Sequence, residues 1–312
     1  MPPEKLAMWN RRRTLRTLAA AGTYAALRPS IARAQTRTIL TRPIPSTGEL
    51  LPVVGLGTWI TFNVGDDPVA RDACAEVMRN FVEARGRMID SSPMYGSSQD
   101  VIGYGLRKTT LTGRIFSADK VWISSGAQGR EQIERSRRKW QVNRFDLVQV
   151  HNLLNWQEHL PTLFAMKAAG QVRYVGITTS EGRRHRDIEQ LMRSQPIDFV
   201  QVTYNPVDRE VEERILPLAR DRGIAVIVNR PFREGALIRA LARQPLPPWA
   251  ADIDCTGWAE LVLKFIVAHH AVTCAIPATT SVAHVRENMN AAYGRLPDAA
   301  LRQRMIAAVE RA

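Results

Sequence analysis

Cysteine is scarce in this sequence, and long hydrophobic runs are missing. The three cysteines, Cys74, Cys255 and Cys274, are too few and too scattered for a disulfide framework or a zinc site, so we expect core thiols and no metal. No run of about 18 or more apolar residues occurs, so we predict no transmembrane helix. No G-x-G-x-x-G motif follows an expected strand, which argues against a Rossmann domain.

The formal net charge of +13 is unevenly distributed along the 312 residues. Residues 1–34 contribute a net +6 of it, and the remaining +7 is spread over expected helices such as 131–140 and 181–193. A basic excess spread in this way is typical of a solvated surface, so we expect no nucleic-acid partner. With 45% hydrophobic residues, the chain is long enough for one large α/β domain.

Residues 1–34 have the features of an export signal. A basic cluster at 10–16 precedes a mildly apolar stretch at 17–27, and Ala32-Arg33-Ala34 offers a small-residue cleavage site. The pair Arg11-Arg12 resembles a twin-arginine signal. Asn10 stands where such signals usually have serine, and Thr14 stands where they usually have phenylalanine. On this interpretation the twin-arginine export machinery carries the folded domain 35–312 to the periplasm, and no stable membrane insertion follows signal removal. The alternative is a basic arm on a cytoplasmic protein.

Apolar segments of strand length alternate with segments of helical periodicity. Eight such β-then-α units argue for a closed (β/α)8 TIM barrel rather than an open sheet. We expect strands at 53–58, 88–90, 115–121, 146–151, 173–178, 199–204, 224–229 and 272–276, and helices at 67–85, 98–107, 131–140, 160–169, 185–193, 210–222 and 258–270. An N-terminal β-hairpin with its turn at 46–48 precedes them, and the long connection 230–256 is expected to cover the barrel mouth.

The segment 87–96 indicates where chemistry lies. It reads as a short buried strand that ends on Asp90, followed by a turn that presents Tyr95. The carboxyl ends of barrel strands meet at one mouth, where active sites are built. Taken alone, the segment also fits a helix-capping aspartate and a tyrosine that covers a loop. The other strands deliver polar or aromatic side chains to the same mouth: Trp59, Lys120, His151, Thr178, Gln201, Asn229 and Thr279.

These motifs together resemble the aldo-keto reductase superfamily. They are G-L-G-T-W at 55–59, I-D-S-S-x-x-Y-G at 89–96, A-D-K at 118–120, D-L-x-x-x-H at 146–151, V-G-I-T-T at 175–179, V-Q-V-T-Y-N at 200–205 and I-P-x-T…E-N at 276–288. The resemblance covers residues 38–295 and extends to a twin-arginine-signal-bearing branch, through Q-V-H-N-L at 149–153 and N-R-P-F at 229–232. It implies an NAD(P)H-dependent enzyme that reduces an aldehyde or ketone to an alcohol.

The resemblance makes Asp90, Tyr95, Lys120 and His151 the catalytic residues. Carbonyl reduction needs a proton for the oxygen, and a tyrosine with a free pKa of about 10 is a reluctant donor. We expect the Lys120 ammonium to lower the pKa of Tyr95, Asp90 to hold the lysine, and His151 to hydrogen-bond the substrate oxygen. An alternative register takes 121–126 as the strand and puts Gly126 in the place of the lysine.

The resemblance also implies where the coenzyme, NADP(H) or NAD(H), binds. Thr178, Thr179 and Gln201 would meet the nicotinamide carboxamide, and the segment from Pro231 would meet the pyrophosphate. The adenosine would meet Thr279 and the helix that Ser281 caps. The implied cofactor-binding residues are Thr178, Thr179, Gln201, Asn229, Arg230, Pro231, Phe232, Thr279, His284, Glu287 and Asn288, and the implied substrate pocket comprises Trp59, Trp122 and Asn152.

Three positions depart from the family pattern. Asn229 replaces the aromatic residue that usually stacks on the nicotinamide, and Ala278 and His284 replace the cations that clamp the 2′-phosphate. The preference between NADPH and NADH therefore stays open, and Arg230, Arg233 or Arg286 could compensate. The departures also favour an alternative function, a nucleotide-binding barrel with little turnover that acts as a redox sensor or partner-binding module. A carboxylate-based hydrolase is weaker, because no second acid at a strand end partners Asp90.

Overall fold

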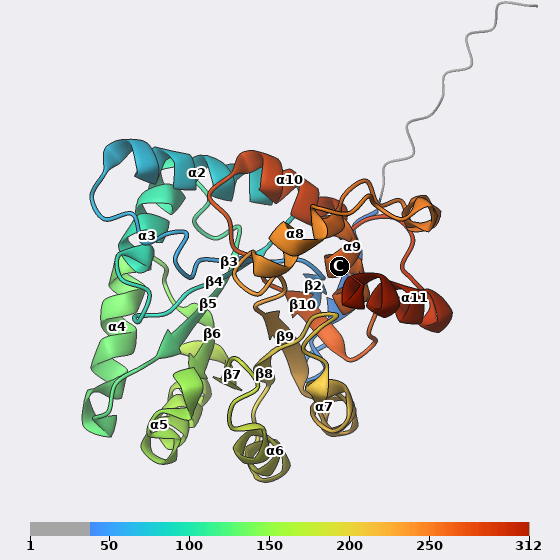
Figure 1. The fold of residues 1–312 in the computed structure, drawn as a ribbon. Helices are drawn as coiled ribbons and strands as arrows, with labels where there is room; N and C mark the ends of the chain where they lie inside the picture. The colour runs from blue at the N-terminus through green and yellow to red at the C-terminus, as the bar shows by residue number, and fades with distance from the viewer. Residues whose placement is uncertain (1–37, 312) are drawn as a thin grey trace, which may run out of the picture. The chain divides into compact units, whose positions relative to one another are not determined.

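The computed structural model describes residues 38–311, so the expected export signal at 1–34 lies outside the described residues. Eight parallel strands form one sheet, in which each strand pairs with the next along the chain (Figure 1). Parallel bridges between Val54 and Ala275 and between Gly57 and Ala278 join the two edges of this sheet. The sheet therefore closes almost completely, and the predicted (β/α)8 barrel is confirmed.

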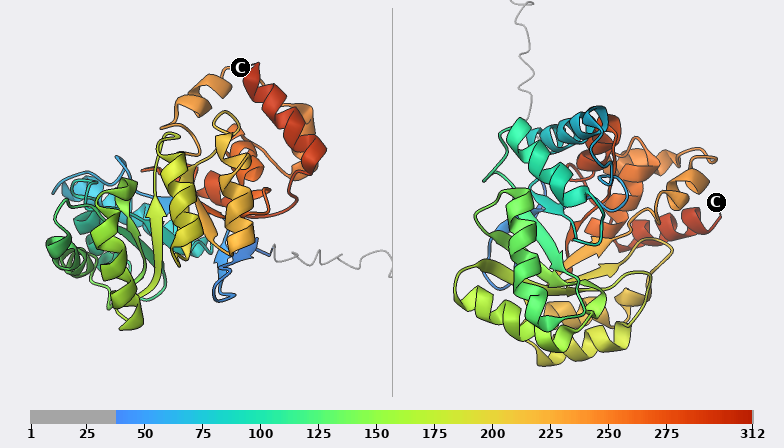
Figure 2. Two further views of the ribbon diagram at one scale, coloured as in Figure 1. Left: turned by 90° about the horizontal axis from the view of Figure 1, so that it is seen from below. Right: turned by 90° about the vertical axis from the view of Figure 1, so that its left-hand side faces the viewer.

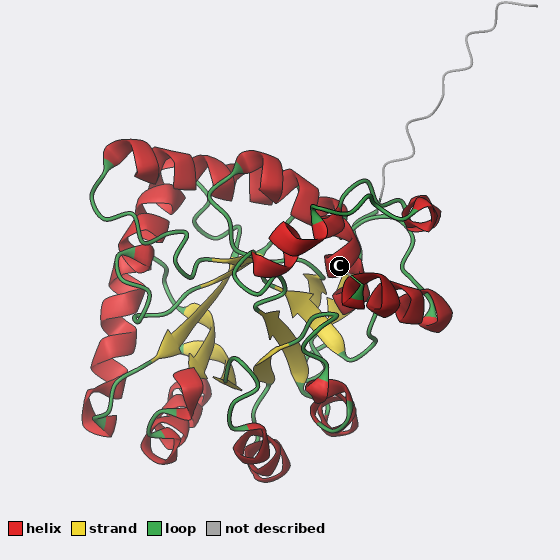
Figure 3. Cartoon of the chain, in the orientation of Figure 1, coloured by secondary structure: helices red, strands yellow, loops and turns green. Residues whose placement is uncertain are grey.

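Helices surround the barrel strands on the outside (Figure 3). The barrel strands are β3 (Leu56–Gly57), β4 (Met88–Asp90), β5 (Phe116–Val121), β6 (Phe145–Val150), β7 (Val172–Thr178), β8 (Phe199–Thr203), β9 (Ala225–Asn229) and β10 (Val272–Ala275). The α-helices are α2 (Pro68–Glu83), α3 (Ser98–Lys108), α4 (Gly129–Trp140), α5 (Trp156–Ala168), α6 (His185–Ser194), α7 (Ile215–Arg222), α8 (Ala236–Leu241), α9 (Trp258–Val267), α10 (Val282–Asn290) and α11 (Ala299–Glu310). Short 3-10 helices lie at η1 (Gly126–Gln128), η2 (His151–Leu153), η3 (Glu210–Glu212) and η4 (Pro248–Ile253).

Several boundaries differ from the sequence-based expectations. The helix expected at 210–222 is divided into η3 and α7, and α5 begins at Trp156, ahead of the expected residue 160. The connection 230–256 is not an irregular loop, because it contains α8 and η4, and Leu237 and Leu241 of α8 are buried. The C-terminal helix α11 was not expected from the hydrophobic pattern, although the Asp298 carboxylate caps it by accepting the Leu301 N–H at 2.8 Å.

The predicted N-terminal hairpin is present. Its strands β1 (Thr41–Pro43) and β2 (Leu50–Pro52) pair antiparallel (Figure 2). Ile44 and Leu51 are fully buried in a cluster that includes Phe116 and Phe199, the first residues of β5 and β8. The hairpin therefore covers the amino-terminal end of the barrel and leaves the opposite end for the site.

The interior of the barrel changes from apolar to polar along the strands. Alternate residues of a strand share one face, so Phe116, Ala118 and Lys120 of β5 all point inward. Phe116 and Ala118 belong to the buried apolar cluster, whereas Lys120 lies near the carboxyl end of the strand. The same two-residue step places Gln149 and His151 above Leu147 of β6. The apolar layers thus form a floor beneath the polar residues.

The three cysteines are free and buried, as expected. Among residues 38–311, none of the helices combines the length and apolarity needed to cross a membrane.

Candidate active site

A cleft of about 610 Å³ opens at the carboxyl ends of the barrel strands. Its walls come from strand ends, from the segment after β9 and from the first turns of α10. Most of the residues singled out in the sequence meet here, namely Trp59, Asp90, Tyr95, His151, Asn152, Thr178, Gln201, Asn229, Arg230, Pro231, Phe232, Thr279, His284, Glu287 and Asn288. Thr179 and Trp122 do not line the cleft, and Lys120 lies buried behind Asp90 and Tyr95.

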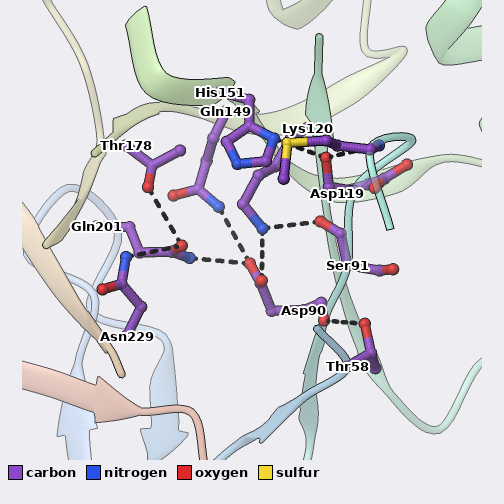
Figure 4. Close-up of polar contacts among 12 residues, drawn as sticks. Thr58, Asp90, Ser91, Asp119, Lys120, Gln149, His151, Thr178, Gln201 and Asn229 are labelled. Atoms are coloured by element: carbon purple, nitrogen blue, oxygen red, sulfur yellow. Dashed lines mark hydrogen bonds and ion pairs between the residues drawn. The ribbon is translucent and has the colours of Figure 1, made fainter. Parts of the chain in front are cut away.

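A buried ion pair occupies the bottom of the cleft. The Lys120 Nζ lies 2.5 Å from Asp90 Oδ2 and donates a second hydrogen bond of 2.8 Å to the Ser91 carbonyl (Figure 4). Both side chains are almost inaccessible to solvent, with exposed fractions of 0% and 2%. Lys120, and not Gly126, therefore takes the lysine position, because Gly126 begins η1 beyond the end of β5.

Tyr95 and His151 stand over this pair. The Lys120 Nζ lies 5.1 Å from the centre of the Tyr95 ring, and the rings of Tyr95 and His151 meet edge to face at 5.7 Å. On its other side the Tyr95 ring contacts Trp59 at 4.9 Å between ring centres. A bound small molecule in the cleft would thus touch a phenol and an imidazole held at fixed orientation.

The electrostatics of Tyr95 differ from the sequence-based expectation. Burial raises the pKa of Tyr95 and outweighs the nearby Lys120 ammonium, which acts in the opposite direction. The expected net lowering is therefore wrong for the free site, because the desolvation of a nearly buried phenol could not be read from the sequence. Burial, followed by the charge of Lys120, lowers the pKa of His151 to about 2, so the imidazole is neutral at physiological pH.

The ion pair at Lys120 is favoured despite its burial. Burial alone lowers the pKa of Lys120, but the negative charge of Asp90 and the neighbouring Tyr95 reverse this effect, and the net pKa is raised. Lys120 therefore remains an ammonium and can stabilise negative charge that develops on Tyr95.

Amide side chains support Asp90 from the far side. The Gln201 Nε2 donates to Asp90 Oδ1 at 2.9 Å, and the Gln149 Nε2 approaches the same oxygen at 3.3 Å (Figure 4). Gln201 Oε1 accepts from Thr178 Oγ1 at 3.2 Å and from Asn229 Nδ2 at 3.4 Å. Gln149 was missed in the sequence, although its place two residues before His151 puts it on the same inward face.

The far end of the cleft brings together the residues expected to contact adenosine. Ser281 caps α10 by accepting the His284 N–H at 3.4 Å, as the sequence predicts. Thr279 and Asn288 are almost buried, while His284 stays exposed. With amides and hydroxyls at both ends and a volume within the range of small-molecule sites, the cleft can hold an extended polar cofactor.

The three arginines that could replace the cations missing at positions 278 and 284 already contact other side chains. Arg286 donates to Asn80 Oδ1 at 2.9 Å, across to α2. Arg230 pairs with Glu181 at 3.0 Å and with Glu234, and Arg233 lies 3.4 Å from Asp208. Each of these cations already faces a carboxylate or an amide oxygen.

A second cleft of about 740 Å³ lies outside the barrel, against α3 and α4. It is lined by charged surface residues such as Arg107 and Arg138, and by no strand end. None of the candidate site residues from the sequence lines this cleft, so we do not take it as the active site despite its larger volume. Within residues 38–311, no cluster of three or more His, Cys, Asp or Glu side chains could hold a metal ion.

Known proteins resemble this chain in sequence. Methylglyoxal reductase YeaE of Escherichia coli is 26% identical over 245 residues, which cover 76% of this chain and 84% of that protein. The NADH-specific methylglyoxal reductase of the same organism is 24% identical over 333 residues, covering 86% of this chain and 99% of that protein.

Solved structures share the fold. Aldo-keto reductase AKR11C1 from Bacillus halodurans, in its holo form, superposes with a TM-score of 0.70 at 23% identity, covering 87% of this chain and 96% of that one. An aldo-keto reductase from Klebsiella pneumoniae in complex with NADPH gives a TM-score of 0.70 at 21% identity, covering 86% of this chain and 94% of that one. The sequence model of the aldo/keto reductase family matches residues 53–304, which include all eight barrel strands. The chain belongs to the aldo/keto reductase family.

Proposed function

We propose that the protein reduces an aldehyde or ketone to an alcohol, with Tyr95 as the general acid. Family membership makes it an NAD(P)H-dependent oxidoreductase. The observation that carries the assignment of Tyr95 is the buried Lys120–Asp90 pair beside its ring, at the bottom of the cleft. A proton donor beside a fixed positive charge is the combination that the reduction of a carbonyl needs, because its oxygen becomes negative as hydride is added, and this supports the proposal.

The side chains divide the work between proton donation and charge stabilisation. When bound in this cleft, a nicotinamide coenzyme would supply the hydride for carbonyl reduction. Tyr95 keeps its proton at neutral pH because its pKa is raised, and it donates that proton to the oxygen as negative charge develops. Lys120 then stabilises the tyrosinate left behind, while Asp90 and the Ser91 carbonyl hold the lysine in place. Neutral His151 supplies a hydrogen bond to the same oxygen.

Tyr95→Phe tests this assignment. The variant keeps the ring contacts with Trp59 and His151 but loses the hydroxyl, so we expect turnover to fall by about 10²–10⁴-fold while coenzyme binding is retained. Turnover is measured by absorbance of the reduced coenzyme with a panel of aldehydes and ketones, beginning with methylglyoxal because two relatives are named for its reduction. A variant with most of the wild-type rate would remove Tyr95 from the acid role.

We also propose that the protein prefers NADH. Ala278 and His284 stand where the family usually places cations, and Arg230, Arg233 and Arg286 are held by other partners. A charge-assisted contact to phosphate is worth roughly 1.5–3 kcal/mol, so the absence of two such contacts should weaken NADPH binding by at least about 100-fold. One relative, the NADH-specific methylglyoxal reductase, is named for the same preference.

Titration of tryptophan fluorescence with NADH and with NADPH measures the preference. The variant Ala278→Lys/His284→Arg restores both cations and should shift the ratio of dissociation constants toward NADPH. Tighter binding of NADPH by the wild type would contradict the proposal and point to Arg239. Arg239 lines the cleft, and its guanidinium donates, among the described residues, only to the Glu234 carbonyl, at 3.4 Å.

The titration and the turnover assay together separate the enzyme from its alternative. Coenzyme binding without reduction of any carbonyl would favour the redox sensor or partner-binding module, in which Asn229 at the position of the stacking aromatic reflects lost turnover. Turnover that depends on Tyr95 would exclude the module.

For the segment 1–34 we propose export by the twin-arginine machinery to the periplasm, on the strength of Arg11-Arg12 and the residues that follow them. Expression of the full chain in a bacterium that has this machinery, followed by fractionation, tests it. The variant Arg11→Lys/Arg12→Lys should hold the protein in the cytoplasm, and equal export of both forms would contradict a twin-arginine signal.

A further inference from the structure

Ser92 is buried beneath the cleft and contacts the imidazole of His151. Its Oγ lies 2.7 Å from His151 Nδ1, and its exposed fraction is 0%. The other ring nitrogen, Nε2, makes no hydrogen bond within residues 38–311, and His151 lines the cleft. The imidazole therefore has one nitrogen anchored to the protein and the other left for whatever the cleft contains.

The hydrogen bonds available to the Ser92 hydroxyl determine where its proton is directed. A hydroxyl carries one proton and two lone pairs. The Met94 N–H already donates to Ser92 Oγ at 3.2 Å and so occupies one lone pair. Among the described residues, the sole acceptor within reach of the hydroxyl proton is His151 Nδ1. If Nδ1 carried a proton instead, that proton would take the second lone pair and leave the hydroxyl proton buried without a partner, which is unfavourable.

We propose that Ser92 is a positioning residue that holds His151 in the neutral tautomer with its proton on Nε2. In this tautomer Nε2–H is a hydrogen-bond donor directed into the cleft, and Nδ1 is an acceptor satisfied by Ser92. The consequence for catalysis rests on the proposed reductase function: a donor suits an oxygen that becomes negative, whereas the other tautomer would present a lone pair and repel it.

Charge at His151 is consistent with this assignment. The imidazole is neutral, since burial and then Lys120 lower its pKa to about 2. The charged groups around it are Lys120 and Asp90 behind the Tyr95 ring, and they remain paired with each other. A neutral imidazole carries its proton on either Nδ1 or Nε2. The contact at Nδ1 therefore determines whether Nε2 is a hydrogen-bond donor or an acceptor.

Nitrogen-15 NMR of histidine-labelled protein reads the tautomer directly and does not require activity. The chain has six histidines, and the signal of His151 is identified by its absence from the variant His151→Gln. We expect the pattern of a protonated Nε2 and an unprotonated Nδ1 between pH 6 and 8. The opposite pattern would overturn the proposal, even if the enzyme proves to be a reductase.

Substitution of Ser92 gives the second measurement. In Ser92→Ala the Nδ1 loses its partner, so we expect a mixed or reversed tautomer signal and a fall in kcat of about tenfold or more, with KM changed less than kcat. Ser92→Thr keeps a hydroxyl and should retain the tautomer. Ser98→Ala is the matched control, because it removes another fully buried hydroxyl, one that contacts Ser91 Oγ at 2.9 Å and not His151.

The two proposals fail in distinguishable ways. An unchanged tautomer signal in Ser92→Ala would overturn the role of Ser92. An active Tyr95→Phe with a normal His151 signal would overturn the acid assignment and leave the role of Ser92 intact.

Discussion

Replacing Lys120 with methionine removes the cation of the buried Lys120–Asp90 pair and keeps most of the side-chain volume. The Asp90 carboxylate would then lie in the barrel with only amide partners, Gln201 at 2.9 Å and Gln149 at 3.3 Å. Breaking a buried ion pair from one side costs about 3–5 kcal/mol, because the remaining charge is neither solvated nor neutralised. Since domains are stable by about 5–15 kcal/mol, the variant should fold but be strongly destabilised.

Urea unfolding followed by circular dichroism measures this loss. Lys139→Met is the matched control, because it breaks the Lys139–Asp100 pair of 2.8 Å, in which both side chains are 43% exposed. An exposed pair is worth about 0–1 kcal/mol, so the control should change the free energy of unfolding little. The double variant Asp90→Asn/Lys120→Met removes both charges and should recover much of the loss.

Two results would refute the reasoning. If Lys120→Met cost no more than Lys139→Met, the pair would not be desolvated as the structure shows. If the double variant were no more stable than Lys120→Met, the cost would come from lost packing rather than from the unpaired carboxylate.

Two further predictions concern residues beside the site. Burial above all raises the pKa of Asp119 to about 7, although the positive charge of Lys120 opposes the shift. Between about pH 4 and 7 the native state therefore holds a proton that the unfolded chain releases. The free energy of unfolding should fall as the pH rises through this range. The variant Asp119→Asn has no carboxyl group to titrate. Its free energy of unfolding, measured relative to wild type, should therefore rise by up to about 4 kcal/mol from pH 4 to 8. A difference that does not change with pH would contradict the raised pKa. A Cβ on Gly57 would lie 2.6 Å from the Ile276 carbonyl oxygen, where the barrel closes, so Gly57→Ala should destabilise the fold by about 1–3 kcal/mol in urea unfolding. Gly55→Ala, with its nearest atom at 3.0 Å, should cost less, and equal costs would argue against a tight closure at Gly57.

The sequence by itself was enough to predict the barrel and the group at its mouth. Short apolar strands alternate with helical segments along the chain, which predicts a parallel barrel, and the strands of such a barrel end on the same side. The sequence therefore predicts that Asp90, Tyr95, Lys120 and His151 lie near one another. Features that depend only on neighbouring residues, such as the Ser281 cap of α10, could also be predicted from the sequence.

Only the tertiary structure decided which partner each side chain takes. The direction of the Tyr95 pKa depends on desolvation by all its neighbours, and no local pattern reports that sum. Likewise, Arg286 could reach a coenzyme or Asn80, and the choice follows from how α10 packs against α2. The hydrogen bond from Ser92 to His151 joins residues 59 positions apart, so its existence depends on the closure of the barrel rather than on either sequence motif.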